Sequence, residues 1–281
     1  MKYGASTFIW VSPFSNKTLD LIQHAKDIGF DLLEICVEDV DTIDVAAIKK
    51  ASEKAGIGIL ICGAFGPERD ISSEDKNIRK LGIQYIKTCI DYAGALGSPL
   101  VSGPMYSATG KARLLPDREK QQQVAWAVEG MKEVAAYAAA KNVRLAVETL
   151  NRFETDFMNT VESGLKFFDK VGMDNVGFLL DTFHMNIEEK DIPKAIRAAG
   201  NKVFNFHACS NDRGTPGEDH LDWKGINQAL KDIHYGGPVV IESFTTEITE
   251  IARAVSLWRP LAQSQDILAS EGLSFLKRTI I

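Results

Sequence analysis

The segment VGFLLDTFHMNIEE, residues 176–189, places Asp181 directly after an apolar run that is typical of a buried strand. Three other segments repeat this arrangement: RLAVE ends at Glu148, VFNFH ends at His207, and PVVIE ends at Glu242. Burying even a neutral polar group without a partner costs roughly 2–7 kcal/mol, and a charge costs more, so these four side chains need a shared compensating partner. A divalent cation is the simplest such partner.

Strand-like runs alternate with helical patterns along the whole chain, which favours βαβ units and a parallel sheet. The glycines Gly29, Gly56, Gly97 and Gly172 stand where a left-handed residue ends a helix before the next strand. Eight β-then-α units predict an α/β fold, a (β/α)8 TIM barrel of the single-domain type, with its active site at the C-terminal ends of the strands. The expected strands are residues 3–8, 31–35, 58–62, 99–102, 144–148, 176–181, 203–207 and 238–242.

Length and charge indicate one domain, residues 1–281, that acts on a small molecule. A chain of 281 residues with 45% hydrophobic content suffices for one large core. The net charge of −6, without a basic stripe, argues against nucleic acid or an anionic membrane as a partner. The connections at residues 63–73, 103–116 and 210–222 are expected to be long βα loops that carry specificity.

The cysteines Cys36, Cys62, Cys89 and Cys209 are widely spaced and form no CxxC pair. This pattern predicts buried small apolar residues or pocket walls in a reducing compartment. The N-terminus lacks a signal-like apolar region, and no run reaches the roughly 18 apolar residues of a membrane span. We therefore expect a soluble, unprocessed, cytoplasmic protein.

Each of the four polar residues also has an ordinary explanation when it is taken alone. Glu148 and Glu242 could form structural ion pairs, Asp181 could cap the following helix, and His207 could be a hydrogen-bonded core histidine. Four such coincidences on consecutive strands are harder to accept than one site that needs all four. Three oxygen donors and one nitrogen, without a thiolate, favour Mn²⁺, with Co²⁺ or Mg²⁺ as alternatives, over structural Zn²⁺.

Two glutamates on well-separated strands suggest proton transfer on opposite faces of a bound substrate. A divalent cation that binds adjacent substrate oxygens stabilises an enediolate by several kcal/mol, while Glu148 and Glu242 take and return the proton. That arrangement suits epimerisation. A single base on one face would instead give an aldose–ketose isomerisation, and the residues alone leave both open.

Several segments resemble the signatures of ketose 3-epimerases, the D-tagatose and D-psicose 3-epimerase group of the xylose isomerase-like TIM barrels. The most specific ones are ETLNRFE at 148–154 and LDTFHMNIEE at 180–189, followed by FH…NDR…PG between residues 206 and 217. The likeness runs the whole length of the chain, through SEDK at 73–76, VIESF at 240–244 and WR at 258–259.

This resemblance implies Glu148, Asp181, His207 and Glu242 as ligands of one divalent metal ion, with Glu148 and Glu242 also the acid/base pair. It further places Glu154, His184 and Arg213 at substrate-binding positions, where the last two can donate to substrate oxygens. Taken alone, His184 could be a capping histidine and Arg213 a solvated loop charge. Three further residues are expected as pocket walls or simple core: Cys62, Phe244 and Phe14.

The chain departs from the family pattern at three places around the expected pocket. The loop after the fourth strand offers Tyr106 and puts Thr109 where the family often has Trp, while Ser6 and Ser243 replace an aromatic residue and a proline. These changes leave the metal chemistry intact and predict a wider or wetter distal end, which bears on the preferred sugar.

The resemblance implies a metal-dependent 3-epimerase of free ketoses such as D-psicose/D-fructose, D-tagatose/D-sorbose or L-ribulose/L-xylulose. No phosphate cradle or basic cluster stands in the late βα loops. The alternatives are an aldose–ketose isomerase or an epimerase of a related keto acid or inositol. An endonuclease IV-like nuclease fits poorly with five histidines and an acidic surface, and a non-catalytic sugar-binding barrel would not need both glutamates. The family also implies a homodimer or homotetramer.

Overall fold

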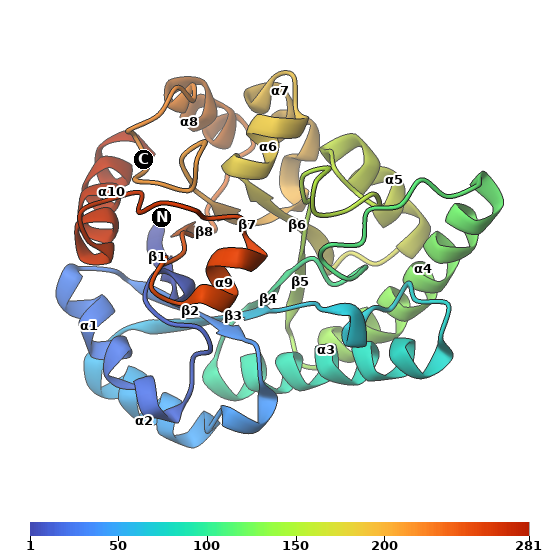
Figure 1. Ribbon diagram of the computed structural model, residues 1–281, viewed down its shortest axis with the longest axis horizontal. Helices are drawn as coiled ribbons and strands as arrows, with labels where there is room; N and C mark the ends of the chain where they lie inside the picture. Colours follow the sequence, from blue (N-terminus) through green and yellow to red (C-terminus); the bar gives the residue numbers. More distant parts are fainter. Residues whose placement is uncertain (281) are drawn as a thin grey trace.

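Eight parallel strands close into a barrel in the order β1 to β8, and β1 pairs with β8 to complete the ring. The computed structural model describes residues 1–280, and Figure 1 looks onto the ring of strands with helices around it. The strands are β1 Lys2–Ser6, β2 Leu32–Val37, β3 Gly58–Gly63, β4 Leu100–Gly103, β5 Arg144–Glu148, β6 Val176–Asp181, β7 Val203–His207 and β8 Pro238–Ile241. The predicted TIM barrel is therefore confirmed.

Ten α-helices lie among the described residues, most of them on the outside of the barrel. They are α1 Asp20–Ile28, α2 Val45–Ala55, α3 Lys76–Leu96, α4 Asp117–Ala139, α5 Val161–Val171, α6 Thr182–Glu188, α7 Ile192–Ala199, α8 Trp223–Asp232, α9 Thr249–Ala254 and α10 Gln265–Thr279. Short 3₁₀ turns lie at η1 Thr7–Ile9, η2 Asn16–Thr18, η3 Val40–Thr42, η4 Pro67–Arg69 and η5 Gly200–Lys202. Gly29, Gly56, Gly97 and Gly172 end α1, α2, α3 and α5 in the left-handed region, as predicted.

Five of the eight expected strands have different ends in the structure. The strand expected at residues 3–8 stops at Ser6, because the Ser6 side chain accepts a hydrogen bond from the Phe8 backbone and starts the turn η1. The strands expected at 31–35, 58–62 and 99–102 each extend past their predicted C-terminal end, to Val37, Gly63 and Gly103. The strand expected at 238–242 ends one residue early, at Ile241.

The barrel interior changes from apolar to polar along the strands. A ring of seven buried residues fills its lower part: Leu32, Leu60, Leu100, Ala146, Leu179, Phe204 and Val240. Residues two positions apart on a strand point to the same side. The inward side chains that follow this ring therefore include Glu34, Cys62, Ser102, Glu148, Asp181 and Glu242, all buried. The apolar ring closes the bottom of the barrel, and polar groups gather toward the C-terminal ends of the strands.

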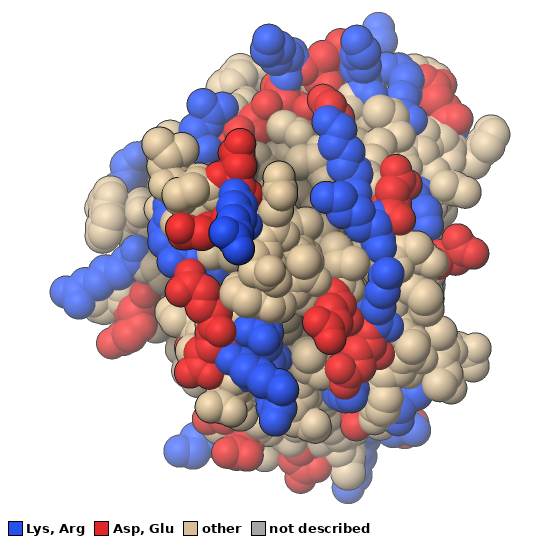
Figure 2. Space-filling model, turned by 90° about the vertical axis from the view of Figure 1, so that its right-hand side faces the viewer, with Lys and Arg blue, Asp and Glu red and all other residues tan. Residues whose placement is uncertain are grey.

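The outer surface carries both signs of charge. On the face formed by the helices at the right of Figure 1, Lys and Arg side chains lie among Asp and Glu side chains, without a large region of one sign (Figure 2). Within residues 1–280, no helix combines the length and the apolar character needed to cross a membrane. All four cysteines are buried free thiols, as predicted.

Candidate metal centre and active site

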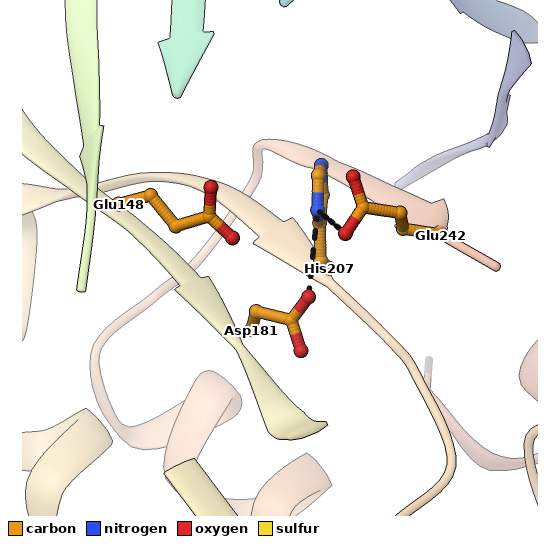
Figure 3. Close-up of side chains that lie close together, drawn as sticks. All are labelled: Glu148, Asp181, His207 and Glu242. Carbon is orange, nitrogen blue, oxygen red and sulfur yellow. Dashed lines mark ion pairs between the residues drawn. The ribbon is translucent and has the colours of Figure 1, made fainter. Parts of the chain in front are cut away.

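Four buried side chains converge at the C-terminal ends of β5 to β8. One ligand atom from each of Glu148, Asp181, His207 and Glu242 lies within 4.8 Å of all the others. Figure 3 shows Glu148 and Glu242 approaching from opposite sides, with Asp181 and His207 between them. The four positions that the sequence placed after apolar runs are therefore neighbours in space.

Strand register explains why these residues meet. Asp181 and His207 are paired positions on β6 and β7, so their side chains leave the sheet at one level. Asp181 also caps α6, because its Oδ1 accepts a 2.7 Å hydrogen bond from the Phe183 backbone. From the sequence, helix capping and membership of the site were alternative interpretations of Asp181. In the structure one carboxylate does both, because Oδ1 caps the helix and Oδ2 faces the cluster. Oδ2 of Asp181 remains directed at the cluster, 3.7 Å from His207 Nδ1.

The His207 ring shows that the cluster fits a metal ion. Its Nε2 is 2.7 Å from Glu34 Oε1, whereas Nδ1 is buried and has no hydrogen-bond partner among the described residues. Nδ1 lies 3.7 Å from both Asp181 Oδ2 and Glu242 Oε2. Ligands at about 2.0–2.2 Å from one ion are up to about 4.4 Å apart, close to the span of this cluster. An orphaned imidazole nitrogen facing three carboxylates is a donor set suited to a hard or borderline divalent cation.

The protein's own charges push the pKa values of the two glutamates apart. Burial raises the pKa of Glu148 above its ordinary value, although the hydrogen bond with His184 opposes the shift. Burial acts on Glu242 in the same direction, but the charges of His207 and Arg213 outweigh it and hold its pKa below the ordinary value. Two carboxyl groups with opposite shifts are the pattern of an acid/base pair.

The pKa values of Asp181 and His207 are shifted by the same network of charges. Burial alone would raise the pKa of Asp181, but Arg213 lowers it well below its usual range. Burial acts on His207 by lowering its pKa, and the carboxylates of Glu34 and Glu242 outweigh this and raise it well above 6.5. The carboxylates therefore favour positive charge on the imidazole, and a cation at Nδ1 would provide that charge without the proton.

A cavity of about 870 Å³ opens above this cluster. Its polar end contains Glu148, Asn151, Glu154, His184, Arg213 and Glu242. Apolar side chains also line it, among them Phe8, Phe65 and Phe153, and part of its wall comes from Ile251 and Val255. The last two belong to or follow α9, which crosses the mouth of the barrel in Figure 1. The volume is within the roughly 300–1,000 Å³ of small-molecule sites.

Comparison with known proteins agrees with this geometry. A model of the xylose isomerase-like TIM barrel family matches residues 22–278. The chain belongs to this family. It is 38% identical over 279 residues to a Synechocystis protein named "Probable ketose 3-epimerase", covering 99% of this chain and 96% of the relative. It is also 32% identical to a D-psicose 3-epimerase of Agrobacterium fabrum, covering 95% and 93% of the two chains.

Solved structures give the same assignment. A D-allulose 3-epimerase from Methylomonas sp. matches with a TM-score of 0.93 and 33% identity, covering 99% of this chain and 98% of that chain. The protein is thus an isomerase of the ketose 3-epimerase group, and the resemblance found in its sequence motifs is confirmed.

The three residues that the ketose 3-epimerase motifs suggested for substrate binding lie beside the cluster. Arg213 is only 6% exposed, so the solvated-loop interpretation is wrong for it. Its Nη1 bridges Asp181 Oδ2 at 2.7 Å and Glu242 Oε2 at 2.9 Å. Glu154 accepts a 2.8 Å hydrogen bond from Asn151 Nδ2 and lines the cavity.

The ring of His184 is oriented by Asn151. The Asn151 backbone N–H donates to Nδ1 at 3.1 Å, which leaves the hydrogen of the neutral ring on Nε2. Glu148 Oε1, 3.4 Å from Nε2, can accept this hydrogen, whereas Arg213 Nη2, 3.1 Å away and itself a donor, is a close neighbour and not a partner in this tautomer. His184 therefore presents an N–H to the polar end of the cavity rather than capping a helix. Asn151 was not singled out from the sequence, although it lies inside the LNRFE segment.

The expected pocket walls divide between the cavity and the core. Cys62, Phe244 and Thr109 line the cavity. Phe14 is fully buried in the main core and does not line the cavity, so its wall interpretation is wrong. Tyr106 is also fully buried, because its ring packs on Phe157 and Phe167 away from the cavity.

Sequence reasoning missed Glu34, the residue that holds His207. Glu34 lies in the middle of β2 with no exposed surface, among apolar neighbours. A signal was available, because a charged residue inside the run LLEICV must either break the strand or face a polar interior. Asn205 in the run VFNFH gives the same signal. Its Nδ2 donates a 2.9 Å hydrogen bond to Glu34 Oε2.

Proposed function

We propose that this protein inverts C3 of free ketoses, with Glu148 and Glu242 as the two acid/base groups. The observation that carries the proposal is the placement of these carboxylates on opposite sides of one cluster, three strands apart in the barrel (Figure 3). A substrate held between them can lose a proton to one face and receive one from the other. The names of the relatives support the same reaction.

The two glutamates have different surroundings. Burial raises the pKa of Glu148, whereas the charges of His207 and Arg213 outweigh burial and lower the pKa of Glu242. In one direction Glu242 removes the C3 proton of the ketose and Glu148 delivers a proton to the other face. The reverse direction exchanges the two roles, as a reversible epimerisation requires.

His184 and Arg213 would orient the substrate and balance charge as the proton leaves. Both can donate to the carbonyl and hydroxyl oxygens that become negative in the enediolate. Glu154 can accept from a substrate hydroxyl at the same end of the cavity, and Phe244 and Cys62 would form its walls.

One divalent cation would be held by Glu148, Asp181, His207 and Glu242, and when bound it supplies positive charge next to the substrate oxygens. We propose Mn²⁺ first, with Co²⁺ or Mg²⁺ as alternatives, because the donor set has three carboxylates and one imidazole. The orphaned Nδ1 of His207 supports this proposal.

The substrates that we propose are free ketohexoses and ketopentoses of the D-psicose/D-fructose, D-tagatose/D-sorbose and L-ribulose/L-xylulose types. The charged side chains that line the cavity are Glu38, Glu148, Glu154, Arg213 and Glu242, so a single buried arginine faces four carboxylates. That balance disfavours a phosphorylated sugar.

The test is to incubate protein loaded with Mn²⁺ with a panel of ketoses in D₂O and to separate the products. Deuterium at C3 with inverted configuration supports the proposal. Label at C1 or C2 would instead indicate an aldose–ketose isomerase, the alternative reaction for one base on one face. Loss of turnover after complete chelation, with recovery on adding Mn²⁺, tests the metal separately.

Three further expectations accompany this function. We propose that residues 1–281 act as one domain in the cytoplasm, and that the protein forms a homodimer or homotetramer. Light scattering coupled to size exclusion measures the assembly, and a monomeric mass at micromolar concentration would contradict it.

A further inference from the structure

A carboxylate from the far side of the barrel contacts the histidine of the metal cluster. Glu34 is on β2 and His207 is on β7, and Oε1 of Glu34 lies 2.7 Å from Nε2 of His207. Neither side chain has any exposed surface. This contact lies below the reacting groups, on the side of the cluster that faces the apolar floor of the barrel.

The contact decides which ring nitrogen can bind a metal. A carboxylate accepts hydrogen bonds, so the Nε2 atom of His207 must carry a hydrogen to satisfy Glu34. In the neutral ring that leaves the lone pair on Nδ1, the nitrogen that has no partner among the described residues and faces Asp181 and Glu242. The opposite tautomer would place an N–H toward the cation and two acceptors against each other at Nε2.

Glu34 is itself held in place. Its second oxygen, Oε2, accepts a 2.9 Å hydrogen bond from Asn205 Nδ2, which also lies 2.9 Å from Ser102 Oγ. Asn205 Oδ1 accepts from the Phe206 backbone N–H at 2.9 Å, which fixes the orientation of the amide. All three partners are fully buried. The carboxylate therefore cannot turn away from His207 without breaking a buried network, which is costly.

We infer that Glu34 is a positioning residue, which fixes the Nδ1 tautomer and the ring plane of His207 for a divalent cation. It does not line the substrate cavity, and its two oxygens contact Asn205 and His207, so its direct contact with the metal cluster is made through His207. Partners of this kind contribute roughly 10–100-fold to metal affinity. The inference rests on the metal centre of the proposed function, and it adds one residue of β2, Glu34, to that centre.

The first test is calorimetric titration of Mn²⁺ into chelator-treated protein. Glu34→Leu keeps much of the side-chain volume and removes the acceptor, and it is expected to weaken Mn²⁺ binding about 10–100-fold. Glu34→Gln can still accept through its amide oxygen, so it should recover part of the loss. The matched control is Ser98→Ala, which removes a buried hydroxyl that donates to the Leu100 carbonyl outside this network, and it should leave the Mn²⁺ affinity within about twofold.

A second test needs no variant. Long-range ¹⁵N–¹H NMR of the wild-type protein reports the tautomer of His207, and hydrogen on Nε2 is expected with Nδ1 unprotonated when a diamagnetic divalent ion such as Mg²⁺ is present. The opposite tautomer, or wild-type Mn²⁺ affinity in Glu34→Leu, would overturn the inference. Failure of the wild-type protein to bind any divalent ion would instead overturn the metal centre itself.

Discussion

Arg213 Nη1 lies 2.7 Å from Asp181 Oδ2, and both side chains are buried at the mouth of the barrel. The same nitrogen reaches Glu242 Oε2 at 2.9 Å, so one guanidinium links two of the four clustered carboxylate and imidazole groups. Arg213 holds this position with a left-handed backbone, φ 69°, in the long loop after β7. The loop therefore supplies the positive side chain that the strand ends lack.

Replacing this arginine is expected to destabilise the fold strongly in the absence of metal. Arg213→Ala leaves two buried carboxylates without their cation, which costs about 3–5 kcal/mol for a buried pair. Urea unfolding in the presence of chelator measures the loss, and added Mn²⁺ should restore part of it by binding the native state. The control is Arg259→Ala, which removes an exposed pair with Asp212 and should change stability by less than about 0.5 kcal/mol. Equal effects of the two variants would contradict the prediction.

Removing either acid/base group is expected to stop epimerisation while leaving a partial reaction. At saturating Mn²⁺, Glu148→Gln and Glu242→Gln should each lower kcat by at least about 10²–10⁴-fold, since a positioned proton-transfer group contributes this much and each glutamate also holds the cation. Each variant should still exchange the C3 proton of the epimer that faces the remaining carboxylate, seen by NMR in D₂O. Glu188→Gln is the control, because Glu188 pairs with Arg152 outside the cavity lining. Full turnover in either cluster variant would exclude a two-base reaction.

The width of the cavity at Thr109 is expected to set the range of sugars. Thr109 lines the cavity and its backbone N–H donates to the Phe65 carbonyl at 2.8 Å, so a larger side chain there would occupy space beside Phe65. Thr109→Trp should therefore lower kcat/KM for ketohexoses about tenfold relative to ketopentoses, a difference of about 1.4 kcal/mol. The control is Thr109→Ser, with little change in the ratio. An unchanged ratio in the Trp variant would mean that the substrate does not reach this wall.

Glu38 is expected to make stability fall as the pH rises. Burial raises its pKa above 4.5, against the opposing effects of the Ser12 hydrogen bond and Arg69, and its Oε2 is buried without a partner among residues 1–280. The folded state therefore binds this proton more tightly than the unfolded state, and the resulting stabilisation is lost as pH rises from 4.5 through the folded pKa. Glu38→Gln removes this dependence. The Tm of the variant should exceed that of the wild type by an amount that grows with pH and then levels off.

Thermal unfolding from pH 4 to pH 8 measures the difference. Glu53→Gln on the exposed side of α2 serves as the control and should follow the wild type. A Tm difference between Glu38→Gln and the wild type that shrinks with rising pH would contradict the expected direction.

Two helix glycines are expected to respond to alanine in opposite ways. A Cβ at Gly164 on α5 would lie 2.2 Å from Phe178 Cε1, so Gly164→Ala forces α5 away from β6 and should cost about 1–3 kcal/mol. A Cβ at Gly94 on α3 meets nothing within 4 Å, and Gly94→Ala should stabilise by up to about 1 kcal/mol. Urea unfolding of both variants checks the pair. Destabilisation of equal size would show that close packing is not the cause.

The sequence by itself determined the barrel and its four clustered residues, because both depend on local periodicity. Alternating apolar runs and glycine-ended helices predict β-then-α units, and a polar residue at the end of such a run is visible without coordinates. A closed parallel barrel then leaves one outcome for Glu148, Asp181, His207 and Glu242, since its strand ends meet at one mouth.

Only the tertiary structure decided the partners of these residues. Glu34 and His207 are 173 positions apart, and their contact depends on the closure and register of the barrel, which no local pattern encodes. Arg213 resembled a solvated loop charge in the sequence because the path of its loop, and hence its burial, is set by packing over the strand ends. Hydrogen bonds across the barrel are non-local, so their geometry appears only when every strand is in place.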